Sequence, residues 1–255
     1  SATFLNSTFM PFNEGGQDTN LFTCRDDGTA EATITFENSV LTATKHDGTP
    51  NRLILCLTVA SQTSVSTMNV INSEIHVGRY ATIGQSNRGI LNMQSGTMTV
   101  GENLNLGNNS TDVRYQGYGE LEMSDGSITA ASIWVRTGKN QISKANVSGG
   151  LLKSVGTFGL QRNGTAHFSG TARVEAATFR LDAPSPAGMN PHCSLSGSAT
   201  LVCNTLTISA GSIDLNDSAT IVLNGDQRAS VAAYVTQDKI TAEGLGGRKV
   251  PIYLM

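Results

Sequence analysis

Hydrophobic and polar residues alternate with a period of two over much of the middle of the chain. Such alternation is typical of short β-strands that are buried on one side. Residues 91–107 contain three successive stretches of this kind, without the 3.6-residue period of a helix. The apolar set is Leu91, Met93, Met98, Val100, Leu104 and Leu106, and the polar set is Asn92, Thr97, Thr99, Asn103 and Asn105. The pattern therefore predicts three half-buried strands in this segment.

This unit recurs along the chain. Residues 68–84 align with residues 91–107 at an offset of 23 residues and without a gap. The two longest spacings between copies coincide with insertions at 108–119 and 182–192. A period of roughly 20–24 residues that tolerates insertions predicts a solenoid. One equivalent apolar or small position can be followed through seven copies: Val77, Val100, Ala130, Ser154, Val174, Leu201 and Ile221.

Residue pairs that end in glycine mark the corners of the predicted coils. Ser-Gly, Asp-Gly or Gly-Gly lies between the first and second strands of most copies, where a sharp corner needs a positive φ. Three strands and three corners per copy predict an all-β protein, a right-handed parallel β-helix of about seven coils. Residues 1–64 are β-rich but do not follow the repeat, so we interpret them as an N-terminal β cap. Residues 65–224 hold the repeats, and residues 225–255 form a C-terminal cap in which 227–235 predict a short helix.

Composition narrows the classes of function. Only 15% of residues are charged, with 17 Lys and Arg against 20 Asp and Glu, and 27 residues are Gly. The chain lacks the basic excess that neutralises phosphates, so no nucleic-acid partner is expected. No apolar run approaches the ~18–20 residues of a transmembrane helix, so no membrane-spanning segment is expected. Ser, Thr and Asn replace the missing charge, which favours strands over helices.

The N-terminus and the cysteines bear on the compartment. Residues 1–12 lack the basic start and long apolar stretch of a signal peptide, as in an exported protein after signal cleavage or in a trimmed chain. The four cysteines have no metal-ligand spacing, so we predict no metal and no other cofactor. We predict the disulfides Cys24–Cys56 and Cys193–Cys203, which join local neighbours in an exported protein. Four buried thiols are the alternative.

One coil and the C-terminal tail carry fuller motifs. The coil is made of Gly89, Leu91, Met93, Gly96, Met98, Val100, Leu104, Leu106 and Gly107, and the tail of Gly225, Asp226, Gln227, Tyr234 and residues 239–242. Both resemble the secreted parallel β-helix repeat proteins of bacteria, of the adhesin and surface-protein type. The resemblance covers roughly residues 66–245. It implies a secreted or cell-surface location, and it implies no catalytic residue, because the group includes adhesins, matrix proteins and polysaccharide-active enzymes.

An enzyme of this fold class would need a chemical cluster on one outward face. Hydrolases use paired carboxylates, and lyases use a Lys or Arg base. Lys153 and Arg173 are predicted to stack as neighbours on the second strand, with Glu175 nearby and no matching carboxylate group on that ladder. We therefore favour solvated outer positions over an active site here.

Aromatic and amide side chains supply the other candidate contacts. Trp134 is predicted on the outward ladder of the third strand, where it could stack on a sugar ring or a partner together with Tyr115 and Tyr118. The alternative is that Trp134 shields neighbouring coils. Asn108 and Asn109 are the candidate N-glycosylation positions, because they lie in an inserted loop.

Three functions follow from these patterns. The first is an extracellular structural β-solenoid that associates with copies of itself through its terminal segments, as a fibre, surface layer or matrix subunit. Leu5, Phe9, Met10 and Phe12 would then add a strand to a neighbour's open edge. The second is a carbohydrate-binding adhesin module with a polysaccharide or glycan partner, and the third a polysaccharide lyase or hydrolase. The low charge leaves little material for an active site, so we expect a scaffold and not an enzyme.

Overall fold

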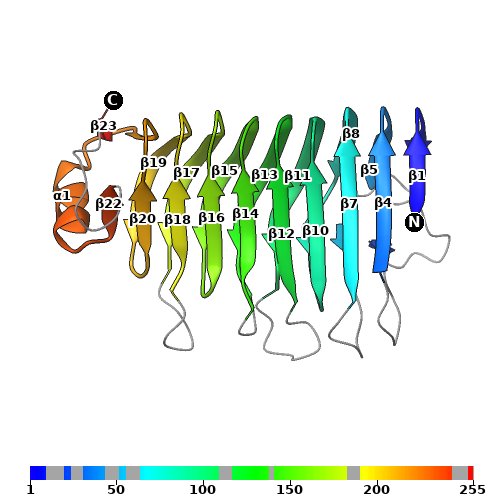
Figure 1. The fold of residues 1–255 in the computed structure, drawn as a ribbon, viewed down its shortest axis with the longest axis horizontal. Helices are drawn as coiled ribbons and strands as arrows, with labels where there is room; N and C mark the ends of the chain where they lie inside the picture. Colours follow the sequence, from blue (N-terminus) through cyan, green and yellow to red (C-terminus); the bar gives the residue numbers. More distant parts are fainter. Residues whose placement is uncertain are drawn as a thin grey trace.

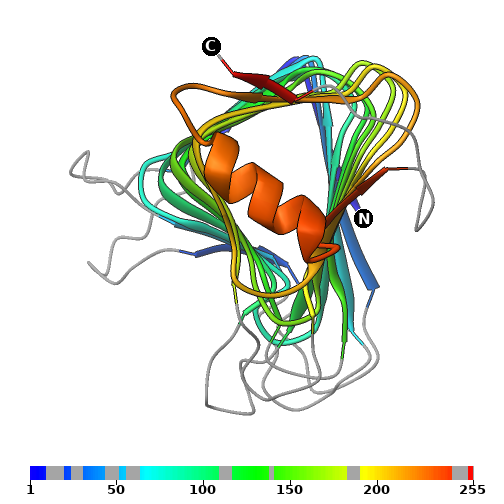
Figure 2. The same cartoon turned by 90° about the vertical axis from the view of Figure 1, so that its left-hand side faces the viewer.

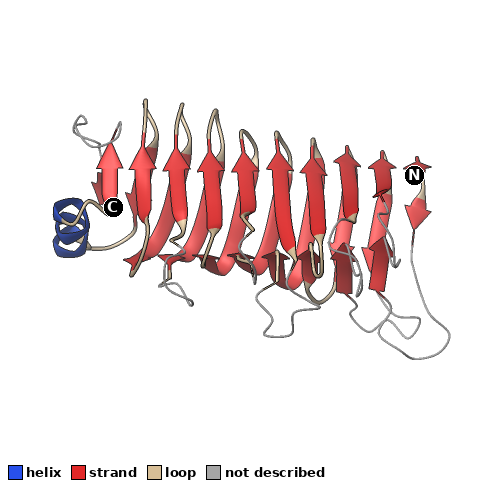
Figure 3. Ribbon diagram, turned by 60° about the horizontal axis from the view of Figure 1, so that its bottom comes forward, coloured by secondary structure: helices blue, strands red, loops and turns tan. Residues whose placement is uncertain are grey.

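The described chain winds into coils that stack along one axis, and the strands of successive coils form parallel sheets along it. A single described helix lies at one end (Figure 1; Figure 3). The computed structural model describes residues 1–9, 20–23, 31–43, 52–55, 64–108, 117–137, 141–182, 190–242 and 252–254. Strands join in order to the strand one coil earlier and one coil later. The predicted all-β parallel β-helix is therefore confirmed.

A ten-stranded sheet forms the first face of the solenoid. Each strand pairs in parallel with the strand of the next coil, from the N-terminal to the C-terminal end. In order they are β1 (Ala2–Leu5), β4 (Glu31–Glu37), β7 (Val65–Ile71), β10 (Arg88–Met93), β12 (Tyr118–Met123), β14 (Ser143–Val147), β16 (Gly164–Phe168), β18 (His192–Leu195), β20 (Ser212–Leu215) and β22 (Ile240–Ala242).

A second sheet of 13 strands bends to form the second and third faces. The longer strands continue through the bend without interruption. The pairing register between neighbouring strands shifts there, between Val100 and Asn103 in one example. Such a bulge lets one strand serve two faces. The main path is β2 (Thr8–Phe9), β5 (Val40–Ala43), β8 (Ser73–Val77), β11 (Gly96–Leu106), β13 (Ser127–Val135), β15 (Leu151–Leu160), β17 (Arg173–Leu181), β19 (Thr200–Ile208), β21 (Thr220–Leu223) and β23 (Ile252–Leu254), and the third face begins with β3 (Asn20–Thr23), β6 (Arg52–Leu55) and β9 (Ala81–Ile83).

The N-terminal region does follow the repeat, contrary to the prediction of a separate cap. Strands β1 to β3 form one rung, and β4 to β6 form the next, because they pair in parallel with each other and then with β7 to β9. The first face therefore has ten rungs and not seven. The first two coils escaped detection because they are long: Ser7 bonds to Ser39 across 32 residues, and Asn69 bonds to Thr35 across 34.

The core is a narrow column along the axis of the solenoid. On each face the inward side chains of successive rungs stack in ladders of Leu, Ile, Val, Met, Phe and Ala, almost all fully buried. Three phenylalanines pack against one another in this column. Phe158 and Phe179 stack on adjacent rungs with ring centroids 5.3 Å apart, and Phe168 from the first face meets Phe158 edge-on at 5.9 Å. Such aromatic contacts stabilise the column beyond the area that they bury.

The corner between the first and second faces changes its form along the chain. In rungs three to six it is short, whereas the later rungs add a buried alanine, at Ala172, Ala199 and Ala219. This longer corner displaces the second strand relative to the sequence alignment. Ser154 therefore pairs with Ala176, and the ladder continues through Cys203 and Leu223, two residues beyond the positions expected from the repeat.

Helix α1 (Arg228–Thr236) lies across the C-terminal end (Figure 2). It takes the place of a third-face strand after β19 and bonds to the backbone that such a strand would satisfy. Gln227 accepts a hydrogen bond from the N–H of Leu206 at 3.0 Å, and Tyr234 accepts one from the N–H of Ile208 at 3.2 Å. Val231 and Tyr234 pack on the core, while Val235 is half exposed. The predicted short helix is thus present at the expected place.

Candidate functional site

A row of polar side chains runs along the outer side of the first face. Each lies on its neighbour in register, and hydrogen bonds join several of them: Asn92 donates to Asn69 at 2.8 Å, and Asn146 donates to Glu122 at 2.6 Å. Asn92, Glu122, Asn146 and His167 line a shallow groove of about 250 Å³. The row consists of Thr3, Thr35, Asn69, Asn92, Glu122, Asn146, His167, Ser194, Asp214 and Thr241.

This groove offers donors and acceptors at the spacing of the rungs, about 4.8 Å. His167 Nδ1 bonds to Ser194 Oγ at 2.7 Å, which fixes the orientation of the ring. Glu122 uses one carboxylate oxygen for Asn146. The groove can therefore hydrogen-bond a ligand rich in hydroxyl groups. The alternation in the sequence placed Asn92 in the polar set of its coil, but it gave no sign that part of this row is hollowed.

The basic pair Lys153 and Arg173 is not stacked as predicted. The longer corner places Glu175 beside Lys153 and moves Arg173 opposite Leu151. Glu175 then bonds to both cations, to Arg173 Nε at 2.7 Å and to Lys153 Nζ at 3.3 Å. The hydrogen bond from Arg173, followed by that from Lys153, lowers the pKa of Glu175 below its ordinary value. Lys153 is therefore engaged in an ion pair with Glu175.

Trp134 lies on the predicted outward ladder, between Asn105 and Gly159, but it is half-buried and not exposed. Its ring lies against the backbone of Gly159, where an added Cβ would meet Cζ3 at 2.3 Å. The Arg136 guanidinium lies 5.6 Å from the ring centroid, at cation–π distance. The structure thus gives Trp134 contacts with its own coils, as in the shielding alternative.

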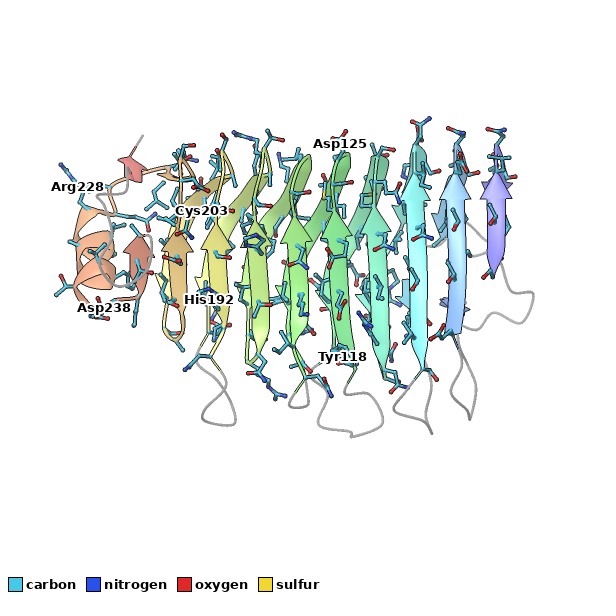
Figure 4. All side chains as sticks on the ribbon, in the orientation of Figure 1. Tyr118, Asp125, His192, Cys203, Arg228 and Asp238 are labelled. Carbon is cyan, nitrogen blue, oxygen red and sulfur yellow. The ribbon has the colours of Figure 1, made fainter. Side chains whose placement is uncertain are left out.

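The other predicted contact residues are only partly described. Tyr118 begins β12 at the lower end of that strand in Figure 4 and is half-buried. Tyr115 and Asn109 lie outside the described residues, whereas Asn108 is half-buried and its N–H donates to the carbonyl of Gly117 at 3.1 Å. The structure therefore does not bring Trp134, Tyr115 and Tyr118 together as one described patch.

The predicted disulfide between Cys193 and Cys203 is wrong. Both cysteines are free thiols in the core, Cys193 on the first face in β18 and Cys203 in β19 of the second sheet (Figure 4). Each occupies an inward ladder position, against Ala166 and Ala176 respectively. Burial raises the pKa of both thiols, that of Cys203 to about 12, so both are unreactive at neutral pH. Cys24 and Cys56 lie outside the described residues.

The predicted assembly segment forms the first rung. Leu5 is 54% exposed in β1, and Phe9 ends β2. Met10 and Phe12 lie outside the described part of the chain. The ring of Phe4 stacks on Phe36 of the next rung at 5.1 Å, so the first rung continues the core to its end.

A second hollow lies over the bend between the second and third faces. It has a volume of about 370 Å³ and is lined mainly by apolar and small residues, among them Gly78, Gly101 and Ala131. Val155 stands beside it and is 63% exposed. The repeated small residue at this bend is the signal in the sequence that could have revealed the hollow.

Neither a metal centre nor a membrane helix is found in the described ranges. No group of three His, Cys, Asp or Glu side chains there is placed to hold a metal ion. No described helix combines the length and apolar character needed to cross a bilayer.

Comparison with known protein families, curated proteins and solved structures finds no match. The resemblance to secreted bacterial β-helix proteins therefore stays a prediction, and the arguments below rest on this chain's own geometry.

Proposed function

We propose that this chain is an extracellular structural β-solenoid that associates with copies of itself through its first rung. The observation that carries the proposal is the outer edge of that rung. Among the described residues, β1 pairs only with β4, β2 only with β5 and β3 only with β6. Each strand thus presents a row of backbone donors and acceptors at the N-terminal end.

The described strands of this edge lack the devices that keep strand edges apart. Native edges are commonly blocked by charged side chains, by Pro or by bulges. Residues 1–9 carry no charged side chain and no Pro, and Phe4 extends the apolar core to the last rung. Helix α1 lies across the opposite end, which favours pairing of two N-terminal ends over head-to-tail stacking (Figure 2). Such a contact is isologous, with the same strands supplied by both copies.

A charge placed on the edge tests the proposal. Thr3 and Thr241 occupy the same outward ladder at opposite ends of the solenoid. Thr3→Lys would bring two like charges together across the interface, and we expect it to convert the dimer to a monomer, whereas Thr241→Lys leaves the dimer intact. Light scattering after size-exclusion chromatography gives the mass, and electron microscopy shows whether rods join end to end. A monomeric wild-type protein at high concentration would refute the proposal.

Carbohydrate binding is a second candidate function, favoured by the polar groove on the first face. The groove is lined by amide, carboxylate, imidazole and hydroxyl groups, which suit a neutral sugar chain. Asn146→Ala would remove a lining amide without touching the core. We expect this variant to lose binding on a glycan array, and unchanged binding would exclude the groove. Neither function assigns a catalytic residue.

A further inference from the structure

The arginines of this protein differ in how their charge is balanced. Five of the described arginines contact a carboxylate of the chain at 2.5–3.5 Å, namely Arg79, Arg88, Arg173, Arg180 and Arg228. Arg136 and Arg162 form no such pair with any described residue. Arg52, the remaining described arginine, contacts Tyr80 on the next rung. Arg136 and Arg162 lie together, at the corner where the third face ends, because Arg162 reaches the carbonyl of Thr137.

Arg136 and Arg162 are both bound to neutral oxygens, of an amide side chain and of the backbone. Arg136 Nη2 donates to Asn105 Oδ1 at 2.8 Å, and Arg162 Nη1 donates to the carbonyl of Thr137 at 3.2 Å. The Nε of Arg136 is buried without an acceptor in the described structure. Burial lowers the pKa of Arg136 from its ordinary value, and the positive charge of Arg162 lowers it further.

One carboxylate on this edge of the stack, that of Asp182, is already engaged. Asp182 follows Arg136 and Gln161 along the same edge of the stack, as the backbone hydrogen bonds from one rung to the next show. Its two oxygens accept from Arg180 and from Gln161 Nε2, each at 2.6 Å. Among the described residues, Arg136 and Arg162 therefore lie at this corner without a carboxylate partner, in a chain whose formal net charge is −3.

We infer that this corner, which we call the Arg136–Arg162 corner, binds a carboxylate group of an acidic polysaccharide. A guanidinium binds a carboxylate through two parallel N–H donors, and such charge-assisted bonds are about twice as strong as neutral ones. The second arginine supplies further attraction at the same place. The anion would compensate a half-buried charge that has no carboxylate partner in the described part of the chain.

The surroundings of the corner favour a sugar acid over an acidic peptide. The ladder that leads to it is made of hydroxyl, amide and aromatic side chains, and Trp134 lies within cation–π distance of Arg136. These groups suit the hydroxyls and C–H faces of a uronic acid ring. A peptide would instead use a free strand edge or an apolar pocket, and the corner follows an interior rung whose strand β13 is paired on both sides.

Polygalacturonate and its fully methyl-esterified form are the probes, because they differ only at the carboxyl group, which is an anion in the first and a neutral methyl ester in the second. Calorimetry at low ionic strength should show that the wild-type chain binds the acid form and not the ester. Arg136→Gln and Arg162→Asn should each weaken binding at least about tenfold. Asn tolerates the positive φ of +54° at position 162, so Arg162→Asn does not strain the backbone there. The variant also leaves the side chains of the Arg136–Asn105 hydrogen bond unchanged. Arg79→Gln, with the same change in charge at a distant corner, should bind as the wild type does.

Three results would overturn the inference. They are equal binding of acid and ester, loss of binding in Arg79→Gln as large as in Arg136→Gln, and equal affinity for poly-glutamate. The inference adds a second, anionic carbohydrate site to the carbohydrate-binding function, and it rests on that function only for the ligand being a carbohydrate. The inference and the carbohydrate-binding function of the groove can fail separately, because Asn146→Ala changes the groove on the first face and leaves the Arg136–Arg162 corner intact. The mass of the Arg136→Gln protein shows separately whether self-association is retained.

Discussion

Two buried serines should respond in opposite directions to the same substitution. Ser154 lies in the core at 2% exposure, and its Oγ has no hydrogen-bond partner in the described structure. Its ladder neighbours Ala130 and Ala176 show that alanine fits this position. An unsatisfied buried hydroxyl costs about 1–3 kcal/mol. Ser154→Ala removes that cost, and we expect the free energy of unfolding to rise by about 1 kcal/mol.

Ser143 is the matched control on the preceding strand. It is fully buried, but its Oγ donates to the carbonyl of Arg136 at 2.9 Å and accepts from the N–H of Gly119 at 3.2 Å. Ser143→Ala leaves both backbone groups without a partner and should cost about 1–3 kcal/mol.

Thermal unfolding followed by circular dichroism separates the two variants. For a chain of this size, about 1 kcal/mol corresponds to a shift of roughly 2–4 °C in Tm. Ser154→Ala should therefore melt above the wild type, and Ser143→Ala below it. If Ser154→Ala melts at or below the wild-type temperature, the hydroxyl is satisfied in solution and the reasoning fails.

Two further variants test the core and the ion pairs. Phe168→Ala removes the ring that meets Phe158 and Phe179 and should lower the free energy of unfolding in urea by about 3–5 kcal/mol. As a control, Leu5→Ala at an exposed position should change it by less than about 0.5 kcal/mol. A loss below about 1 kcal/mol in Phe168→Ala would contradict the packing argument. Glu175→Gln should be less stable than the wild type by at most about 1 kcal/mol at neutral pH, because the pair is partly exposed. The folded-state pKa of Glu175 is lowered, so its contribution is present above the ordinary value of 4.5 and disappears as the pH falls through the lowered pKa. An equal difference between the two proteins at acid and neutral pH would refute it.

Sequence patterns were most informative where the coils are short and alike. The polar positions Asn92 and Asn105 and the outward ladder position of Trp134 were predicted correctly, because alternation and a nearly constant coil length leave one register. The second strand slipped by two positions after Ser154, since a shift of two keeps every side chain on its side of the sheet. Only the buried alanine of the longer corner, as at Ala172, distinguishes the two registers.

The first two coils carried a signal that the repeat alignment did not use. Asn-Ser occurs at the same corner in each of the first three rungs: Asn6, Asn38 and Asn72 all have φ near +47°, and each precedes a serine. Asn72 donates to Asn38 at 2.7 Å, and the Ser39 N–H donates to Ser73 at 2.9 Å. Asn is the residue after Gly that best adopts this conformation. The Arg136–Arg162 corner had no comparable signal, because the unbalanced charges meet only after the coils are stacked.

The direction of the hydrogen bonds gives the solenoid a defined response to force. The two termini lie at opposite ends of the rod, and the bonds between rungs run along its length (Figure 1). An axial pull on the termini loads the outermost rung first and should detach rungs singly. Partners on adjacent rungs are 20–34 residues apart, so each event releases roughly 70–120 Å of chain. Stretched in this way, the molecule would lengthen in steps and dissipate energy at each one.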